Sequence, residues 1–153
     1  MAKHVGVKLP DDLIKVLKSE KTVGILATFS EKGLPHTTPL QCIYPKGSES
    51  ILISIHKDHT GYQNMVWQKK VMMCFLDEDN VAYSVLGRAG VVRAPSEVHP
   101  LMNIVRIDII DIKSDRSVLT KVESGVRWSY TSPEARELTE ALMDELKNLS
   151  QTL

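Results

Sequence analysis

The segment HKDHTGYQN, residues 56–64, holds two of the five histidines of the chain together with a lysine and an aspartate. It follows the apolar run ILISI (51–55) and precedes a stretch that we expect to form a short helix. A strand end, hydroxyl groups, free backbone N–H groups and a helix N-terminus with positive charge nearby together suit a phosphate. The same nine residues have the ordinary polar composition of a solvated loop. Taken alone, they leave both interpretations open.

A metal site is a third interpretation of this segment. His56 and His59 have HxxH spacing with Asp58 between them, and metals do use imidazole and carboxylate ligands. A closed zinc site needs about four ligands, however, and Cys42 and Cys74 lie in separate apolar runs with no sequence reason to converge. We therefore predict no metal site.

The sequence surroundings of the two cysteines favour buried structural residues over catalytic ones. A catalytic cysteine needs a base and an electropositive, partly open setting, whereas Cys42 and Cys74 lie among apolar neighbours. Their positions suit reduced thiols better than a disulfide framework. GxSxG, GxxxxGK[ST] and strand-linked GxGxxG motifs do not occur, so the common hydrolase, P-loop and Rossmann signatures are absent.

Length and charge narrow the class of protein. The 153 residues, 42% apolar and 25% charged, predict one globular domain covering residues 1–153. Nineteen basic residues balance nineteen acidic ones, so no overall field favours nucleic acid or an anionic membrane. Neither a signal-peptide core nor an apolar run long enough to span a membrane is visible. We expect a cytoplasmic protein with no nucleic-acid or membrane partner.

Hydrophobic patterning predicts an α+β domain built on an antiparallel sheet or barrel. Helices are expected after Pro10, over roughly 62–70, and after Ser132, where a serine N-cap and an N1 proline precede leucines at helical spacing. About seven strands are expected in hairpin-like succession: 22–29, 34–44, 51–55, 71–76, 83–94, 102–113 and 121–130.

Three of these predicted strands carry further expectations. Prolines at 35 and 39 cannot donate to a ladder, so the first half of 34–44 should be an edge or bulged segment and the second half should pair normally. Gly87 and Gly90 suggest a bulge or a close approach of another backbone. In 102–113, strict alternation places Ile107 and Ile109 on one face and Ile110 and Ile112 on the other.

Three segments of the chain, taken in order, resemble successive pieces of the pyridoxamine 5′-phosphate oxidase-like family of FMN-binding split barrels. They are GILATFSEKGLPHTTPLQCIY, ILISIHKDHTGYQNMVWQKKVMMCFL and YSVLGRAGVV. The likeness runs from about Leu13 to Tyr130 and depends on order and spacing more than on any single motif. The residues that carry it are Ala27-Thr28, Gly33, Pro35, Asn64, Val71 and Gly87-Arg88-Ala89.

The resemblance implies an antiparallel split β-barrel of six to seven strands with N-terminal, short middle and C-terminal helices. It implies a homodimer with two FMN molecules between the subunits. The flavin ring would lie against Leu40, Gln41, Cys42 and Ile43 and against Ser54, Ile55 and His56. The phosphate would be held by Lys57, His59, Thr60 and Asn64, and Trp128 belongs to a late segment that would reach toward the partner's flavin.

One position departs from the family pattern. Four residues before the helix asparagine, family members commonly have a lysine or arginine for the phosphate, and this chain has Thr60. A threonine hydroxyl donates one hydrogen bond but cannot neutralise a dianion in a partly buried site. Lys57, His56 and His59 are the local candidates for the missing charge.

The resulting expectation is an FMN-binding flavoprotein, with the flavin carrying any oxidoreductase chemistry on an unidentified small molecule. No side chain stands out as an obligatory acid or base. The alternative is a non-redox binding module on the same fold that holds haem, another flavin-like ligand or no cofactor.

Overall fold

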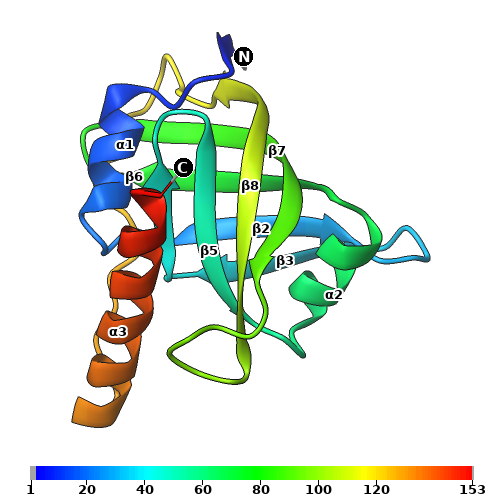
Figure 1. The fold of residues 1–153 in the computed structure, drawn as a ribbon. Coiled ribbons are helices and arrows are strands. Elements are labelled where there is room, and N and C mark those ends of the chain that lie inside the picture. The colour runs from blue at the N-terminus through cyan, green and yellow to red at the C-terminus, as the bar shows by residue number, and fades with distance from the viewer. Residues whose placement is uncertain (1–2, 153) are drawn as a thin grey trace.

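The computed structural model describes residues 3–152 and contains eight strands and three helices (Figure 1). In chain order the elements are β1 (Lys3–Gly6), α1 (Asp11–Lys18), β2 (Gly24–Phe29), β3 (Pro35–Leu40), β4 (Ile43–Lys46), β5 (Ser50–His56), α2 (Thr60–Trp67), β6 (Lys70–Asp77), β7 (Val81–Arg93), β8 (Met102–Ser114) and α3 (Pro133–Ser150). None of the helices in the described part of the chain is long and apolar enough to cross a membrane.

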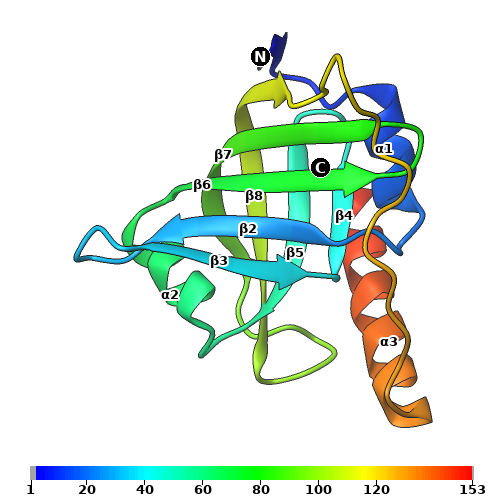
Figure 2. The same cartoon turned by 180° about the vertical axis from the view of Figure 1, so that it is seen from behind.

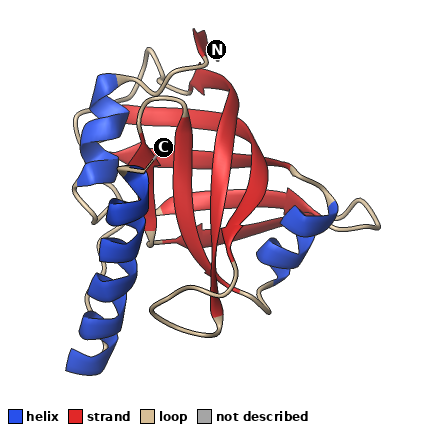
Figure 3. Ribbon diagram, in the orientation of Figure 1, coloured by secondary structure: helices blue, strands red, loops and turns tan. Residues whose placement is uncertain are grey.

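The strands form one antiparallel sheet in the order β3-β2-β6-β7-β8-β5-β4, with β1 added alongside β8. The sheet curls so that its two end strands, β3 and β4, are joined by only Gln41 and Cys42 (Figure 3). The predicted α+β split barrel is confirmed. Figure 1 shows α2 beside the strand ends on one side of the barrel and α1 and α3 on the other.

Alternate residues of the strands point into the barrel and form its core. Leu26 of β2 and Met73 and Phe75 of β6 are fully buried. From β5, Ile51, Ile53 and Ile55 join the same core, although every residue of β5 except His56 is buried. The second face of β5 must therefore be covered as well.

Helix α3 covers that second face. Met143 and Leu146 of α3 pack against Tyr44, Leu52 and Ile104 from β4, β5 and β8. The helix begins as predicted, because Ser132 Oγ accepts a hydrogen bond from the Ala135 N–H at 3.0 Å and Pro133 occupies the first turn.

The faces predicted for the isoleucines of 102–113 are wrong beyond Ile109. Leu86 pairs with Asp111 but Gly87 pairs with Ile109, so Ile110 is an extra residue in β8. Such a bulge reverses which face later residues occupy. Ile107 and Ile112, expected on opposite faces, are both fully buried in the core, and Ile110 is exposed.

The segment 34–44 is one edge strand followed by a second strand. Its first part, β3, pairs with β2 alone, in agreement with the edge position expected for Pro35 and Pro39. Its last residues belong to β4, which pairs with β5. The chain therefore passes from one end of the sheet to the other within two residues.

The predicted strand 121–130 does not exist. This segment has no regular secondary structure, and its contacts with the sheet are isolated. Val122 exchanges hydrogen bonds with Asn80 in the β6–β7 turn, and Trp128 Nε1 donates to the Lys21 carbonyl. Separate contacts therefore hold this segment where a strand would have a continuous ladder of hydrogen bonds. Strand β1, which the sequence did not suggest, pairs with β8.

A buried carboxylate ties α3 to the β7–β8 loop. Glu145 accepts hydrogen bonds from Ser96 Oγ, from the Glu97 N–H at 2.7 Å and from Arg93 Nη1 at 3.1 Å. Its side chain is almost fully buried. Three donors converging on one carboxylate hold the loop against the helix.

We expect Glu145→Gln to lower the free energy of unfolding by about 2 kcal/mol, because an amide keeps the shape but presents its NH₂ group to a donor and loses the charge. Urea denaturation measures the change. Glu97→Gln is the matched control, since Glu97 is exposed and lies 3.5 Å from the same arginine, and its effect should stay within about 0.5 kcal/mol. Equal effects of the two substitutions would contradict the assigned role of Glu145.

Candidate functional site

The segment HKDHTGYQN contains the N-terminus of α2, and His59 is its N-cap. The backbone of His59 is extended, and its Nδ1 accepts a hydrogen bond from the Gly61 N–H at 2.9 Å. This bond satisfies one of the amide groups that a helix leaves unpaired in its first turn. The N–H groups of Thr60 and Tyr62 have no hydrogen-bond partner in the described part of the chain.

The other ring nitrogen of His59 connects α2 to the edge strand β3. His59 Nε2 lies 3.1 Å from Thr38 Oγ1. Because Nδ1 accepts from Gly61, the neutral ring carries its proton on Nε2, and that nitrogen donates to Thr38. Burial lowers the pKa of His59, and the neighbouring His36 and His56 lower it further. His59 is therefore a neutral structural residue and does not supply positive charge.

Asn64 fixes the same helix to β2 from inside the barrel. Its Nδ2 donates to Thr28 Oγ1 at 3.1 Å, and both side chains are buried. Met65 of the same helix belongs to the barrel core. The helix is thus tied to β2 and β3 by two side-chain hydrogen bonds, one on each strand.

Two buried polar atoms, one on β3 and one on the outer face of β5, have unused hydrogen-bonding capacity. His36 Nδ1 of β3 and Ser54 Oγ of β5 have no partner within the described residues. The His36 ring meets the His59 ring edge to face, with centroids 6.0 Å apart. Buried polar groups are normally hydrogen-bonded, so such atoms suggest a group that the protein chain does not itself provide.

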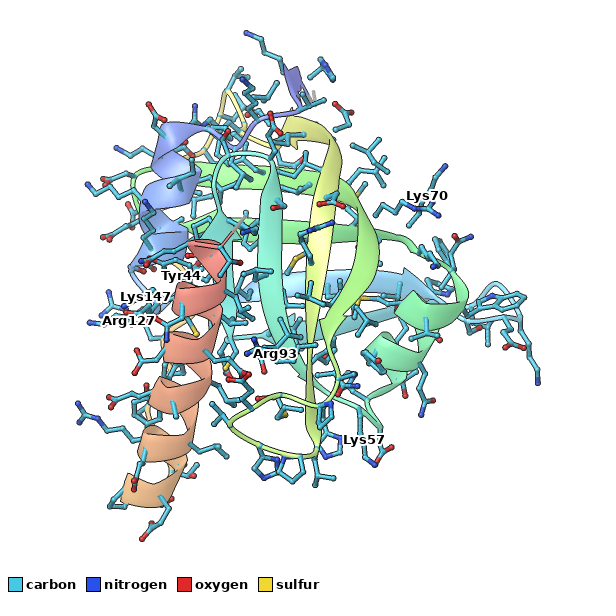
Figure 4. The ribbon with its side chains drawn as sticks, viewed as in Figure 1. Tyr44, Lys57, Lys70, Arg93, Arg127 and Lys147 are labelled. Carbon is cyan, nitrogen blue, oxygen red and sulfur yellow. The ribbon has the colours of Figure 1, made fainter. Side chains whose placement is uncertain are left out.

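The residues predicted to supply positive charge near the N-terminus of α2 lie in different settings. Thr60 is exposed, and His56 Nδ1 accepts from the Asp58 N–H. Lys57, whose backbone N–H donates to the Leu101 carbonyl, is exposed beside the β7–β8 loop (Figure 4). Among the candidates predicted for the missing charge, Lys57 is the permanently charged one.

The residues predicted to face a flavin ring separate into three environments. Leu40, Ile43 and Ile55 point into the barrel core, where only their backbone can contact a ligand. Cys42 packs beneath α3, and burial raises the pKa of its thiol to about 11. Gln41 is exposed, His56 is half-buried and Ser54 is buried.

Trp128 lies in a different part of the molecule. It contacts Lys21 through its indole N–H and packs edge to face against Tyr130. Figure 2 shows the segment before α3 running beside that helix, on the opposite side of the barrel from α2. Within one subunit, Trp128 is not part of the α2 site.

The structure adds two residues that the sequence did not single out, His36 and Thr38, and gives Thr28, one of the residues that carry the family resemblance, a contact with α2. Thr28 and His36 are paired across β2 and β3, and Thr38 lies on the same inward face of β3. The alternating pattern PHTTPL is the signal that could have indicated them, because it places His36 and Thr38 on one face.

Residues 3–152 contain no group of three or more histidine, cysteine, aspartate or glutamate side chains that could hold a metal ion. The polar groups at α2 are hydroxyl, amide, imidazole and backbone N–H groups. This donor set can bind an anion or a polar organic molecule.

Comparison with known proteins agrees with this fold. No curated protein matches the chain. Among solved structures, a "putative pyridoxamine 5′-phosphate oxidase" from Lactobacillus delbrueckii has a TM-score of 0.63 at 20% identity, covering 72% of this chain and 98% of the other. The HupZ protein of Group A Streptococcus has a TM-score of 0.62 at 14% identity, covering 76% and 99%.

An F420 reductase is also similar, with a TM-score of 0.55 at 18% identity, covering 64% of this chain and 94% of the other. At these identities the likeness concerns the fold alone. The family model described as pyridoxamine 5′-phosphate oxidase matches residues 10–122, which span β2 to β8 together with α1 and α2. The chain therefore belongs to the pyridoxamine 5′-phosphate oxidase family.

Proposed function

We propose that this protein is an FMN-binding flavoprotein that works as a homodimer and passes electrons to or from a small molecule. The observation that carries the proposal is the fixed N-terminus of α2, held to β2 and β3 by the Asn64–Thr28 and His59–Thr38 hydrogen bonds. The chain belongs to a family whose members commonly bind flavin-type cofactors.

The phosphate of FMN fits the first turn of α2. The free N–H groups of Thr60 and Tyr62 and the Thr60 hydroxyl would donate to it, in the favourable field of the helix N-terminus. His59 would contribute by fixing this turn, because both of its ring nitrogens are already engaged. Lys57 would supply the positive charge.

The flavin would supply the electron-transfer chemistry when bound. The chain's own residues would hold and orient it, and the unpartnered His36 Nδ1 on β3, beside His59, is a buried polar atom that could contact it. Gln41 is exposed at the junction of β3 and β4 and is free to contact a ligand.

A second copy of the chain would complete the site. Exposed apolar side chains lie together on α2 and on the neighbouring part of β7, with Val66 55% exposed and Val91 50% exposed. Tyr62, Met65 and Val91 line a small groove between these two elements. Contiguous exposed apolar surface of this kind indicates a protein interface.

The absorption spectrum of the purified protein tests the cofactor. The proposal predicts a flavin spectrum, FMN in the supernatant after heat denaturation, and bleaching of the bound flavin by NADPH or NADH with recovery on adding an acceptor. Light scattering after gel filtration should give the mass of a dimer. A colourless protein that does not retain added FMN would overturn the cofactor assignment.

The shortage of charge favours one alternative function. Because His59 is neutral and Thr60 carries no charge, a dianionic phosphate has weak compensation here. The alternative is a non-redox module that binds haem, another flavin-like ligand or no cofactor. A Soret band, or a flavin that is bound but not reduced by either nucleotide, would favour this alternative.

Adding positive charge at Thr60, where the chain departs from the family pattern, gives a direct prediction. We expect Thr60→Lys to tighten FMN binding about fivefold, equivalent to ~1 kcal/mol, because an ammonium at the first helical position lies beside the phosphate. Titration of the flavin-free protein measures it. Gln63→Lys adds the same charge elsewhere on α2 and should change the Kd less than twofold. Similar gains in both variants would mean that the phosphate is not bound at Thr60.

A further inference from the structure

A cavity of about 810 Å³ lies on the α1–α3 side of the molecule. Its walls are the end of α1, the β6–β7 turn, the segment 124–130 and the middle of α3. Two of these walls come after residue 122, where the family match ends. Figure 2 shows the segment before α3 running alongside that helix, away from α2. We call this space the C-terminal groove.

Acidic side chains dominate the lining of the C-terminal groove. Five carboxylates face two basic side chains, Lys21 and Arg127. Glu20 and Glu140 are paired with Lys147 and Arg136 at 3.2 and 2.8 Å. The remaining carboxylates, Asp77, Glu78 and Asp144, have no basic partner within 4 Å in the described residues.

The backbone adds to this negative field. Helix α1 ends at Lys18 with Ser19 as its C-cap, and Ser19, Glu20 and Lys21 line the groove. The C-terminus of a helix carries partial negative charge and favours a cation. Carboxylates from the β6–β7 turn and from α3 therefore meet a helix C-terminus in one space.

An aromatic wall completes the groove. The Trp128 indole is fixed by its hydrogen bond to the Lys21 carbonyl at 3.0 Å and packs against Tyr130 with ring centroids 5.2 Å apart. Val126, which is 64% exposed, adds apolar surface. Aromatic faces attract cations and also bury apolar groups.

We propose that the C-terminal groove binds a small organic ammonium ion that carries an apolar or aromatic group. The ammonium group would lie among Asp77, Glu78 and Asp144, and the apolar part against Trp128 and Val126. A cavity of this volume is within the usual range for small-molecule sites. Within one subunit the groove lies on the opposite side of the barrel from α2.

Benzylammonium is the probe, compared with benzyl alcohol and benzoate, which have the same ring without the positive charge. The readout is the Trp128 indole N–H signal in ¹H–¹⁵N spectra of the full chain, assigned with Trp67→Phe. We expect benzylammonium to shift this signal saturably and at least about tenfold more tightly than benzyl alcohol, with no shift of the Trp67 signal.

Charge-removal variants locate the ammonium group. Glu78→Gln and Asp144→Asn should each weaken benzylammonium binding about two- to fivefold, and the double variant about tenfold. Glu137→Gln is the control, because it removes an exposed charge from α3 outside the groove. FMN content should be unchanged in all variants. Equal binding of benzyl alcohol, a non-saturable shift, or unchanged affinity in the double variant would overturn the proposal.

Discussion

Replacing His59 by alanine is expected to weaken FMN binding about tenfold or more. The substitution removes the N-cap of α2 and the hydrogen bond to Thr38. An N-cap contributes about 1 kcal/mol, a neutral hydrogen bond a similar amount, and ~1.4 kcal/mol corresponds to a tenfold change in Kd. Quenching of flavin fluorescence on titration into flavin-free protein measures the affinity.

Two control variants separate the cap from the link to β3. His59→Asn keeps a good capping oxygen but cannot reach Thr38 in the same way, so its FMN affinity should lie between those of the wild type and the alanine variant. His99→Ala removes a histidine from the β7–β8 loop and should leave the affinity within twofold. Wild-type affinity in His59→Ala would show that the N-terminus of α2 does not bind the cofactor.

Replacing Gly87 by alanine is expected to lower the free energy of unfolding by about 3 kcal/mol. A Cβ at this position would collide with Ile107 Cγ2 and would lie 2.9 Å from the Asp108 carbonyl oxygen. The second contact is with backbone of the paired strand, which cannot move without disturbing the ladder next to the β8 bulge. Overpacking of this kind typically costs 1–3 kcal/mol.

Gly90 is the matched control for Gly87. It lies three residues further along β7, and a Cβ there would have no neighbouring atom within 4 Å. Gly90→Ala should therefore change the free energy of unfolding by no more than about 0.5 kcal/mol. Urea denaturation of both variants measures the difference, and equal stabilities would contradict the close backbone approach at Gly87.

The fold follows from the sequence where local signals and tertiary packing agree. The serine cap, the N1 proline and the spaced leucines predict α3, and prolines in 34–44 predict an edge strand. In β8, tertiary packing determines which residues face the core. The extra residue Ile110 brings Ile107 and Ile112 to the same face. No local signal in an apolar strand reveals such a bulge. Residues 121–130 look like a strand, but their contacts are separate anchors to turns.

The candidate site was predictable in part for a similar reason. HKDHTGYQN predicts a loop followed by a short helix, and the structure places His59 at the start of that helix and Asn64 within it. Their partners Thr28 and Thr38 lie more than twenty residues away and meet α2 only because β2 and β3 pair beneath it. The neutral state of His59 follows from its burial and from the neighbouring His36 and His56, which lower its pKa, and is not visible in the sequence.

The affinity of flavin-free protein for FMN, compared with its affinity for riboflavin, tests the central proposal most directly. Riboflavin has the same ring system and lacks the phosphate, so the ratio isolates the contribution of the N-terminus of α2. We predict one FMN per chain, bound at least about tenfold more tightly than riboflavin. Equal affinity for the two, or binding of neither, would contradict the account.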